Sequence, residues 1–286
     1  MLIKKQRGMI LLNYDLRTCD SAYYFILNFM DMTPDEYITE LVIECENSFE
    51  QFWKRNIDRI LDVDISDLRI RAFHVVGALD DCKEIRENGL MNLQEVLKRD
   101  TVISRALSNC GIFFDIENRI LFCNGKKYDI DYEKYRSRHF LSGLDEKLDR
   151  IAHRVYYDYC VNGFLLNDDV LNYGTSIHER PEFFMTLVEL SSEAEKLDEY
   201  WRNHSKSFIV NFYATVEQIH RFNFELDEWR DPPYEDWNEL DDEMKLKKWM
   251  LSHAIDRANN ELGMQFLYIR DDVIISPVQI ESIEEM

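Results

Sequence analysis

Residues 71–90 read RAFHVVGALDDCKEIRENGL, and this stretch says more about the fold than any other part of the chain. It opens with an apolar run typical of a buried strand, and the run contains one polar residue, His74. A short acidic turn follows, then a helical segment that we expect to end at Asn88-Gly89, because asparagine and glycine terminate helices. The stretch predicts a strand, a helix and a turn in succession, with His74 as a candidate ligand-binding residue.

The composition indicates a folded globular protein. The 286 residues suffice for one large domain or two small ones, and 45% of them are hydrophobic. No apolar run reaches the roughly 18 residues that a membrane-spanning helix needs. The run GMILL near the N-terminus is too short, and too soon followed by charge, for a secretory signal peptide. We therefore expect a soluble cytoplasmic protein without a membrane partner.

The spacing of cysteine and histidine predicts free thiols and no metal site. The six cysteines are scattered without a CxxC pair, and the seven histidines show neither HxxxH nor HExxH spacing. Zinc sites commonly use such closely spaced ligands. In a long chain without an export signal, reduced cysteines are the usual state.

The charge is strongly acidic and unevenly distributed. The chain has 55 acidic against 34 basic residues, a formal net charge of −21, which disfavours general binding of nucleic-acid phosphates. Residues 225–243 alone hold ten acids and one arginine, a net charge of −9. This segment is a solvated surface loop, a docking surface for a basic protein partner, or a barrier that excludes substrates.

The hydrophobic periodicity predicts an α+β fold, because strands and helices alternate without regular βαβ spacing. Thr33-Pro34 is a strong helix start, with threonine as the cap and proline in the first turn. We expect helices over 33–62 (one or two), 93–107, 144–160, 178–190 (starting near Arg180-Pro181) and 245–260. We expect strands within 62–76, 163–168 and 207–216, a β-hairpin over 110–132, and two short strands around Pro277 within 266–283. Trp201, Trp229, Trp237 and Trp249 are expected to be buried packing residues.

His74 followed by Gly89-Leu90 resembles the opening motif of ADP-ribosyltransferases of the diphtheria-toxin and poly(ADP-ribose) polymerase type, in their histidine–tyrosine–glutamate branch. In that family the strand histidine hydrogen-bonds a ribose of NAD, and split antiparallel sheets hold NAD in the cleft between them. Val76 departs from the pattern, since the family often has threonine there. The resemblance implies that NAD is a substrate of this chain.

Residues 162–183 resemble the second motif of the family, a Gly-hydrophobic-Tyr-Phe strand followed by a tyrosine that lies against the nicotinamide. The strand would begin at Gly163-Phe164, and Tyr173 would supply the downstream ring. The segment CGIFF at 110–114 is a competing match for the same strand. The strand tyrosine is missing from both matches, because Leu165 or Phe113 stands there.

The third motif of the family is a strand that begins with the catalytic glutamate and ends in a Gln-hydrophobic pair. Residues 270–283, RDDVIISPVQIESI, fit it if Asp271 takes the place of the glutamate, with Gln279-Ile280 as the pair. Cleavage of the nicotinamide–ribose bond develops a cationic ribosyl group, which a carboxylate stabilises. Asp271 or Asp272 would be that carboxylate, although aspartate is one methylene shorter than glutamate.

The resemblance covers roughly residues 67–286, in three patches. It implies an ADP-ribosyltransferase-like domain over 67–286 with an insertion at about 91–162 and helical insertions, preceded by a helical N-terminal region, 1–66. It assigns Asp271 and Asp272 to catalysis and His74, Gly89, Phe164, Tyr173 and Arg180 to the binding of NAD.

The function that this implies is NAD-dependent mono-ADP-ribosylation of a macromolecule by a divergent bacterial or phage-associated enzyme, a toxin or an anti-phage effector. The acidic charge favours a protein acceptor. One alternative is a catalytically silent member of the fold that binds or regulates a partner through its acidic surface. Another is an unrelated α+β fold, in which His74 is a core residue, Asp271-Asp272 is a turn and Arg180 belongs to a helix start.

Overall fold

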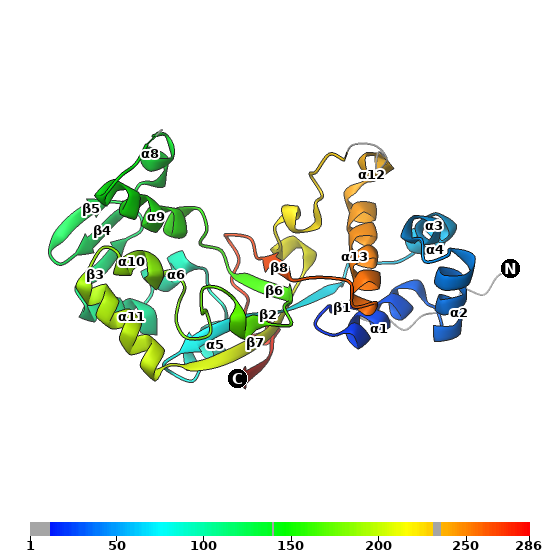
Figure 1. The fold of residues 1–286 in the computed structure, drawn as a ribbon, viewed down its shortest axis with the longest axis horizontal. Helices are drawn as coiled ribbons and strands as arrows, with labels where there is room; N and C mark the ends of the chain where they lie inside the picture. Colours follow the sequence, from blue (N-terminus) through cyan, green and yellow to red (C-terminus); the bar gives the residue numbers. More distant parts are fainter. Residues whose placement is uncertain (1–11, 139, 231–235) are drawn as a thin grey trace. The chain divides into compact units, whose positions relative to one another are not determined.

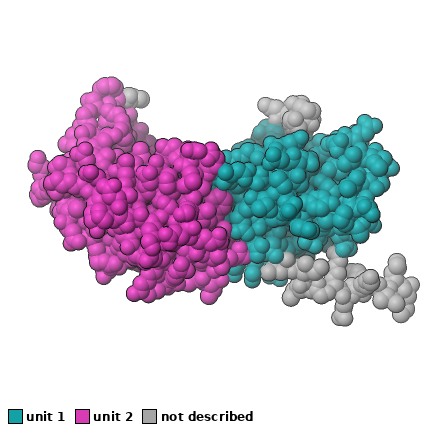
Figure 2. Space-filling view, turned by 60° about the horizontal axis from the view of Figure 1, so that its bottom comes forward, with its two compact units in different colours: residues 1–72, 164–168, 213–267 teal, residues 73–163, 169–212, 268–286 magenta. Residues whose placement is uncertain are grey.

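The computed structural model describes residues 12–138, 140–230 and 236–286, and it confirms the predicted mixed α+β class (Figure 1). The chain divides into two compact units (Figure 2). Unit 1 holds residues up to 72, 164–168 and 213–267, and unit 2 holds 73–163, 169–212 and 268–286. The domain boundary between residues 66 and 67 stays a prediction.

Six strands of the described chain form the larger sheet. Their order is β8 (Gln265–Tyr268), β6 (Asn162–Leu166), β2 (Arg69–Ala78), β7 (Lys206–Ala214) and β9 (Ile280–Glu285), and β1 (Asn13–Tyr14) pairs in parallel with the start of β2. β9 runs antiparallel to β7, with a register shift at Asn211 and Phe212. The order makes β2, β6 and β8 neighbours, so strands from three distant parts of the sequence lie side by side.

Unit 1 is mainly helical, and its core lies between α1 (Cys19–Met30) and α13 (Asp242–Ala258). Thr18 caps α1 through a capping box with Ser21. The other helical segments are α2 (Pro34–Ile38), the π-helix Thr39–Glu44, α3 (Phe49–Arg55), α4 (Ile57–Leu61), α12 (Asp236–Glu239) and the 3-10 turns Val216–Gln218 and Arg221–Phe224. The predicted helix start at Thr33 is confirmed. The prediction of one or two helices over 33–62 is wrong, because this range holds four shorter helical segments, and the left-handed residues Glu46 and Asn47 interrupt the helical path after the π-helix.

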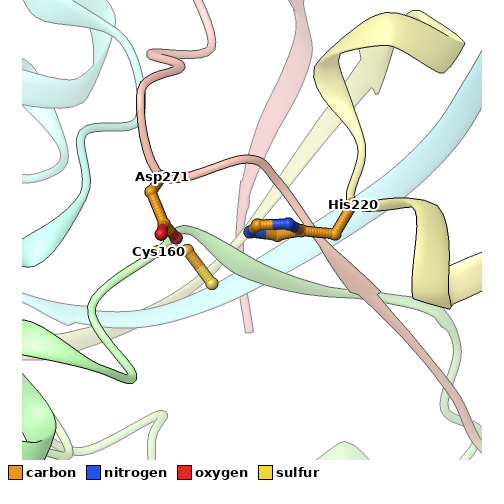
Figure 3. A group of neighbouring side chains, drawn as sticks. All are labelled: Cys160, His220 and Asp271. Carbon is orange, nitrogen blue, oxygen red and sulfur yellow. The ribbon is translucent and has the colours of Figure 1, made fainter.

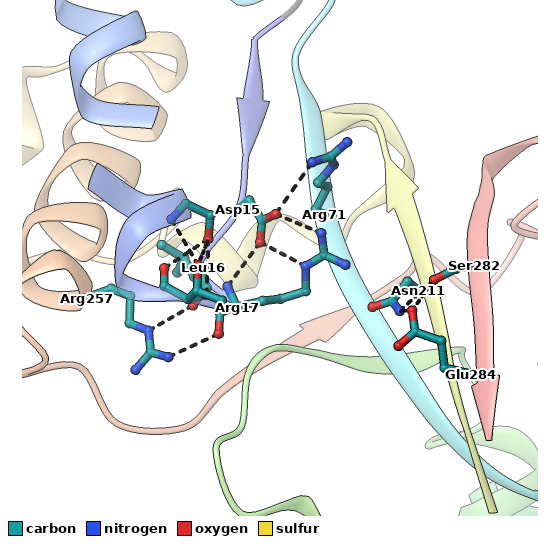
Figure 4. A network of polar contacts seen from close by, with 10 residues as sticks. Asp15, Leu16, Arg17, Arg71, Asn211, Arg257, Ser282 and Glu284 are labelled. Carbon is teal, nitrogen blue, oxygen red and sulfur yellow. Dashed lines mark hydrogen bonds and ion pairs between the residues drawn. The ribbon is translucent and has the colours of Figure 1, made fainter. Parts of the chain in front are cut away.

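Hydrogen bonds and ion pairs hold the first described residues of unit 1 in place (Figure 4). The carboxylate of Asp15 accepts a hydrogen bond from Arg17 Nε at 2.9 Å and lies 3.6 Å from a guanidinium nitrogen of Arg71. Burial alone would raise the pKa of Asp15, but the hydrogen bonds and charges of these arginines lower it overall. Arg257 of α13 donates to the Leu16 carbonyl at 3.0 Å and pairs with Asp168 at 2.8 Å. The network joins β1, the end of β6 and α13 within one unit.

Unit 2 has its own hydrophobic core around a three-stranded antiparallel sheet of β3 (Ile112–Asp115), β4 (Ile120–Cys123) and β5 (Lys126–Asp129). Trp201 is buried in this core, and its indole Nε1 donates to the Gly77 carbonyl at 2.7 Å. The helical segments are α5 (Lys83–Asn88), α6 (Leu93–Lys98), α7 (Val102–Asn109), α8 (Tyr132–Arg136), α9 (Leu144–Tyr156), Val170–Asn172 (3-10), α10 (Phe184–Val188), α11 (Ser192–His204) and Pro277–Gln279 (3-10). The predicted hairpin is thus confirmed, with its two expected turns, at Glu117-Asn118 and Asn124-Gly125, joining the three strands.

Several predicted helices of unit 2 are shorter than their sequence patterns. The pattern over 93–107 is two helices, because Thr101 starts a new one with a capping box to Ser104. The predicted start at Arg180-Pro181 is wrong, since the helix there spans only Phe184–Val188. The strand expected within 62–76 begins at Arg69. None of the helices in the described ranges combines the length and apolar character that a membrane crossing requires.

Candidate functional site

The junction between α9 and β6, residues 154–162, is the centre of a polar cluster in unit 2. Arg154 on the last turn of α9 pairs with Asp158 and with Glu182, the latter at 2.5 Å. Asp158 in turn lies 3.4 Å from the side-chain nitrogen of Asn162, the first residue of β6. Two of the three predicted motif strands, β2 and β6, are neighbours in the sheet beside this junction.

His74 lies on β2 and is bound to this junction. Its ring Nδ1 is 2.7 Å from the Asn162 carbonyl oxygen, which can only accept, so Nδ1 carries the proton and Nε2 carries the lone pair. Burial lowers the pKa of His74, and the bond to Asn162 raises it by less. No partner for Nε2 occurs among the described residues. His74 therefore presents a neutral acceptor nitrogen at pH 7.

We expect His74 to make the folded state less stable in mild acid. Its pKa is depressed on folding, so its contribution is complete above the unfolded value of about 6.5 and is lost as the pH falls toward the folded pKa. His74→Asn should therefore lose less stability than the wild type in urea denaturation between pH 7 and pH 5. His204→Asn, at an exposed site, is the control. Parallel pH profiles for wild type and His74→Asn would contradict the expectation.

Cys160 and Asp271 lie close together at the same junction (Figure 3). His220, also labelled there, belongs to unit 1. The Cys160 thiol is 3.0 Å from the side-chain oxygen of Asn162. Burial, followed by the charges of Asp158 and Asp271, raises the pKa of Cys160 to about 12. A thiol with this pKa is almost entirely protonated at pH 7, so Cys160 is a poor nucleophile.

Asp271 follows β8 in a turn and is held by several contacts of unit 2. Its backbone carbonyl accepts from Asn92 Nδ2 at 2.7 Å, and the same asparagine caps α6. Burial raises the pKa of Tyr159, and the charge of Asp271 and a hydrogen bond to it raise the pKa further. The third motif predicts a strand that begins at Asp271; the structure instead has a turn there, and the next strand begins at Ile280.

Tyr173 follows the 3-10 turn Val170–Asn172, and charged residues of the cluster act on it. Burial raises its pKa, with a further contribution from the charge of Glu182. The charge of Arg154 lowers the pKa of Tyr173, and the charge of Asp158 raises it. Tyr268 is the last residue of β8. Burial raises its pKa, and the charges of Asp158, Tyr173 and Cys160 raise it further. His74, Tyr173 and Asp271 are thus all linked to residues of one junction.

Arg180 lies in a buried ion pair rather than on an open surface. Its side chain is 5% exposed, and its Nε is 2.5 Å from the Asp198 carboxylate on α11. Its Nη1 donates to the Thr175 carbonyl at 2.7 Å. The backbone of Glu179 and Arg180 also approaches Gly77 so closely that a Cβ on that glycine would lie 2.4 Å from a carbonyl carbon. These contacts anchor the loop that carries Tyr173.

Arg180→Met is expected to lower the free energy of unfolding by about 2 kcal/mol, because Asp198 would lose its most buried partner. The loss should be smaller than for a fully orphaned charge, since Arg202 still reaches Asp198 at 2.8 Å. Arg202→Met is the control and should cost less than about 1 kcal/mol, because that guanidinium is half-exposed. Equal losses in urea denaturation would contradict this assignment.

The remaining predicted site residues lie in different settings. Gly89 ends α5 with a φ of 81°, and its Cα packs against the Ile275 backbone, next to the bridge between Leu90 and Ile275. Phe164 belongs to unit 1, where its ring packs 5.3 Å from that of Phe266. The side chain of Asp272 is 68% exposed and pairs with Arg270 at 3.0 Å. The competing match at 110–114 contains β3 of the smaller sheet.

Several polar residues of the junction were missed by the sequence analysis, namely Asn92, Arg154, Asp158, Tyr159 and Asn162 in its binding role. One signal was available, because Arg154 and Asp158 stand four residues apart at a helix end and a run of polar residues precedes Gly163. Their link to His74 and Asp271 has no local signal, since it arises from strand pairing.

The acidic segment 225–243 is partly described, because residues 231–235 lie outside the described residues. Trp229 in this segment is 79% exposed, so its predicted burial is wrong. Trp201, Trp237 and Trp249 are buried as predicted. Arg230 lies over the Trp237 ring at 4.0 Å and forms an ion pair with Glu225, which offsets one acidic charge within unit 1.

Comparison of the chain with models of protein families, with curated proteins and with solved structures gives no match.

Proposed function

We propose that the chain is an NAD-dependent mono-ADP-ribosyltransferase and that NAD binds at the α9–β6 junction of unit 2. The observation that supports this most is the linkage of His74, Tyr173 and Asp271 to one polar cluster, although they are far apart in the sequence. Each belongs to one of the three sequence patches that resemble the family, in the family's order.

The protonation state of His74 suits a role on the ribose. A neutral imidazole whose Nδ1 donates to a carbonyl can accept a hydrogen bond from a ribose hydroxyl at Nε2. The bond to Asn162 fixes the plane of the ring, so the acceptor is oriented before the ligand arrives. His74 would thus position the ribose that undergoes cleavage.

Asp271 is the carboxylate that we assign to the reacting centre. As the bond from ribose to nicotinamide breaks, the ribosyl carbon becomes cationic and the departing nicotinamide takes the bonding electron pair. A fixed carboxylate stabilises that charge without reorganising. The hydrogen bonds of Asp271 with Tyr159 and Asn92 provide such a fixed position. The ring of Tyr173 would cover the nicotinamide.

A cysteine nucleophile is disfavoured for this chemistry. Cys160 is the thiol beside Asp271, and its pKa of about 12 leaves too little thiolate at pH 7. The ribosyl group would then pass directly to an acceptor nucleophile or to water. We favour a protein acceptor, because the net charge of −21 repels phosphate chains, and we extend the proposal to a toxin or anti-phage effector.

A second candidate function is a catalytically silent binding module. It is supported by the turn at Asp271, where the family has a strand that starts with glutamate. The exposed Trp229 within the acidic segment supports it as well, because an exposed tryptophan among acids is typical of a protein-binding surface. The two candidates differ in whether NAD is consumed.

Incubation of the folded protein with nicotinamide-labelled and adenine-labelled NAD, with and without cell lysate, tests the proposal. A transferase releases nicotinamide and leaves adenine label on a macromolecule. His74→Ala should lower both signals at least tenfold, whereas His204→Ala should not. No release and no transfer by a preparation with a cooperative unfolding transition would refute the enzyme and favour the binding module.

A further inference from the structure

A cavity of about 350 Å³ lies in unit 2, away from the residues assigned above. Its walls come from α6, the turn between β3 and β4, α8 and the last residue of α9. This volume is in the range of pockets that hold small organic molecules, about 300–1,000 Å³. The chemistry of the wall therefore decides which ligand it would accept.

Aromatic rings form one side of the cavity. Tyr132 and Tyr156 line it, and Tyr132 belongs to a three-ring cluster with His153 and Tyr157. Ring centroids in this cluster are 4.8–5.5 Å apart, and Tyr157 is exposed. Tyr157 itself is not part of the cavity wall, whereas the partly exposed rings of Tyr132 and Tyr156 are, and aromatic rings in such a wall can stack on planar groups such as nucleobases.

The other side of the cavity carries two cations, Lys98 and Arg119, and two exposed acids, Glu117 and Glu133. Lys98 Nζ is 2.9 Å from a carboxylate oxygen of Glu117, and Arg119 Nη1 is 2.6 Å from Asp131. The Lys98 side chain is 35% exposed, whereas that of Glu117 is 81% exposed. Glu117 can therefore swing into solvent at little cost when an anion reaches Lys98. Arg119 uses one nitrogen for Asp131, which leaves its other N–H donors for an anion.

The backbone of Arg119 adds an independent indication that its side chain has a role. Its φ is 56°, the left-handed conformation that glycine or asparagine would adopt with less strain. Its guanidinium lies over the Tyr156 ring, 5.9 Å from the centroid. The chain thus places an arginine where a turn favours glycine and directs it toward an aromatic wall of the cavity.

We propose that this cavity binds a nucleotide, with the base against the tyrosine wall and a phosphate on Lys98 and Arg119. Gln94 also lines the cavity, and because its Nε2 donates to the Val155 carbonyl at 2.8 Å, its Oε1 is the atom that would accept from a base amino group. The nucleotide is either free or an exposed nucleotide of a single-stranded nucleic acid. This site does not depend on the proposed cleavage of NAD.

The net charge of −21 disfavours long phosphate chains, but it does not prevent a single phosphate from contacting the cavity wall at physiological salt. At about 0.15 M ionic strength, exposed charges more than about 8 Å away are largely screened. Direct contacts of phosphate with Lys98 and Arg119 are screened much less. The affinity for the nucleotide should therefore be measured at this ionic strength, because it then depends mainly on the residues that line the cavity.

Calorimetric titration of the full chain with AMP, ribose 5-phosphate and a single-stranded RNA of six adenylates tests the proposal. We expect AMP to bind at least tenfold more tightly than ribose 5-phosphate, because only AMP offers a base. Binding of RNA at least tenfold more tightly than AMP would identify a nucleic-acid source, and AMP as the tighter ligand would identify a free nucleotide. Binding of neither AMP nor RNA would overturn the proposal.

The variant Arg119→Gly separates binding from folding, since glycine suits the left-handed turn. It should keep or raise the thermal unfolding midpoint and weaken AMP binding at least tenfold. Arg105→Gln, which removes an exposed arginine paired with Asp100 in the same unit, should leave the affinity unchanged. Equal affinities of Arg119→Gly and wild type, or equal binding of AMP and ribose 5-phosphate, would overturn the assignment of the site.

Discussion

Asp271→Asn is expected to lower the rate of nicotinamide release by about 100- to 1,000-fold, the usual cost of removing one preorganised electrostatic contact to a transition state. Asparagine has nearly the same shape, so it can still accept from Tyr159 and keep the backbone bond to Asn92. Only the negative charge is lost. The effect should therefore fall on kcat, with little change in KM for NAD, in a steady-state assay of nicotinamide release.

Asp272→Asn is the matched control for this prediction. The neighbouring side chain is exposed and pairs with Arg270, so its loss should change the rate less than twofold. A further variant, Asp271→Glu, keeps the carboxylate and restores the residue of the family motif, and it should retain far more activity than Asp271→Asn. Equal rates for the two asparagine variants would show that Asp271 is not the reacting carboxylate.

Gly89→Ala is expected to lower the free energy of unfolding by about 4 kcal/mol. Gly89 has a φ of 81° and a ψ of −170°, a region that side chains other than glycine's avoid at a cost of about 1–3 kcal/mol. A Cβ there would lie 2.0 Å from the Ile275 carbonyl oxygen, and overpacking of backbone adds about 1–3 kcal/mol more. Urea denaturation of the full chain measures the loss.

Gly125→Ala provides the comparison, because it shares the positive φ without the crowding. Its φ is 73°, and a Cβ at this position would meet nothing within 4 Å. It should cost about 1 kcal/mol, the backbone penalty alone. Similar losses for the two variants would mean that the 270–276 loop moves freely and that the Leu90–Ile275 bridge contributes little to unit 2.

The predictions for Asp271 and Gly89 concern the same loop, residues 270–276. Gly89 lets the end of α5 approach Ile275, and the bridge from Leu90 to Ile275 holds the loop that begins at Asp271. A destabilised Gly89→Ala variant should therefore also lose nicotinamide release, whereas Gly125→Ala should not. In this view Gly89 contributes a close backbone contact with Ile275 and not a contact with NAD.

Local signals in the sequence predicted several elements correctly. Thr33-Pro34 begins a helix through a capping box, since the threonine and Glu36 satisfy each other's backbone groups within four residues. Asn124-Gly125 forms the turn between β4 and β5, because both residues tolerate a positive φ. The strand with His74 and the helix that ends before Gly89 were likewise readable. Each of these depends only on neighbours along the chain.

Burial and pairing of individual side chains were not predictable in the same way. The sequence predicts that Arg180 is a helix-start residue or a ligand-binding residue. In the structure it forms a buried ion pair with Asp198 on α11. Trp229 has the large apolar side chain of a typical core residue, yet it is exposed. Whether such a side chain is buried or paired depends on segments that are distant in the sequence, and no local pattern indicates them.

The α+β class, the caps and turns, and the three patches with a histidine, a tyrosine and a carboxylate in order all follow from the sequence alone. The strand order, with β6 between β8 and β2, follows only from the tertiary structure, as does the α9–β6 junction near which the three patches meet. The physical reason is that periodicity and capping are short-range, whereas strand order and the burial of charge depend on which distant segments pack together.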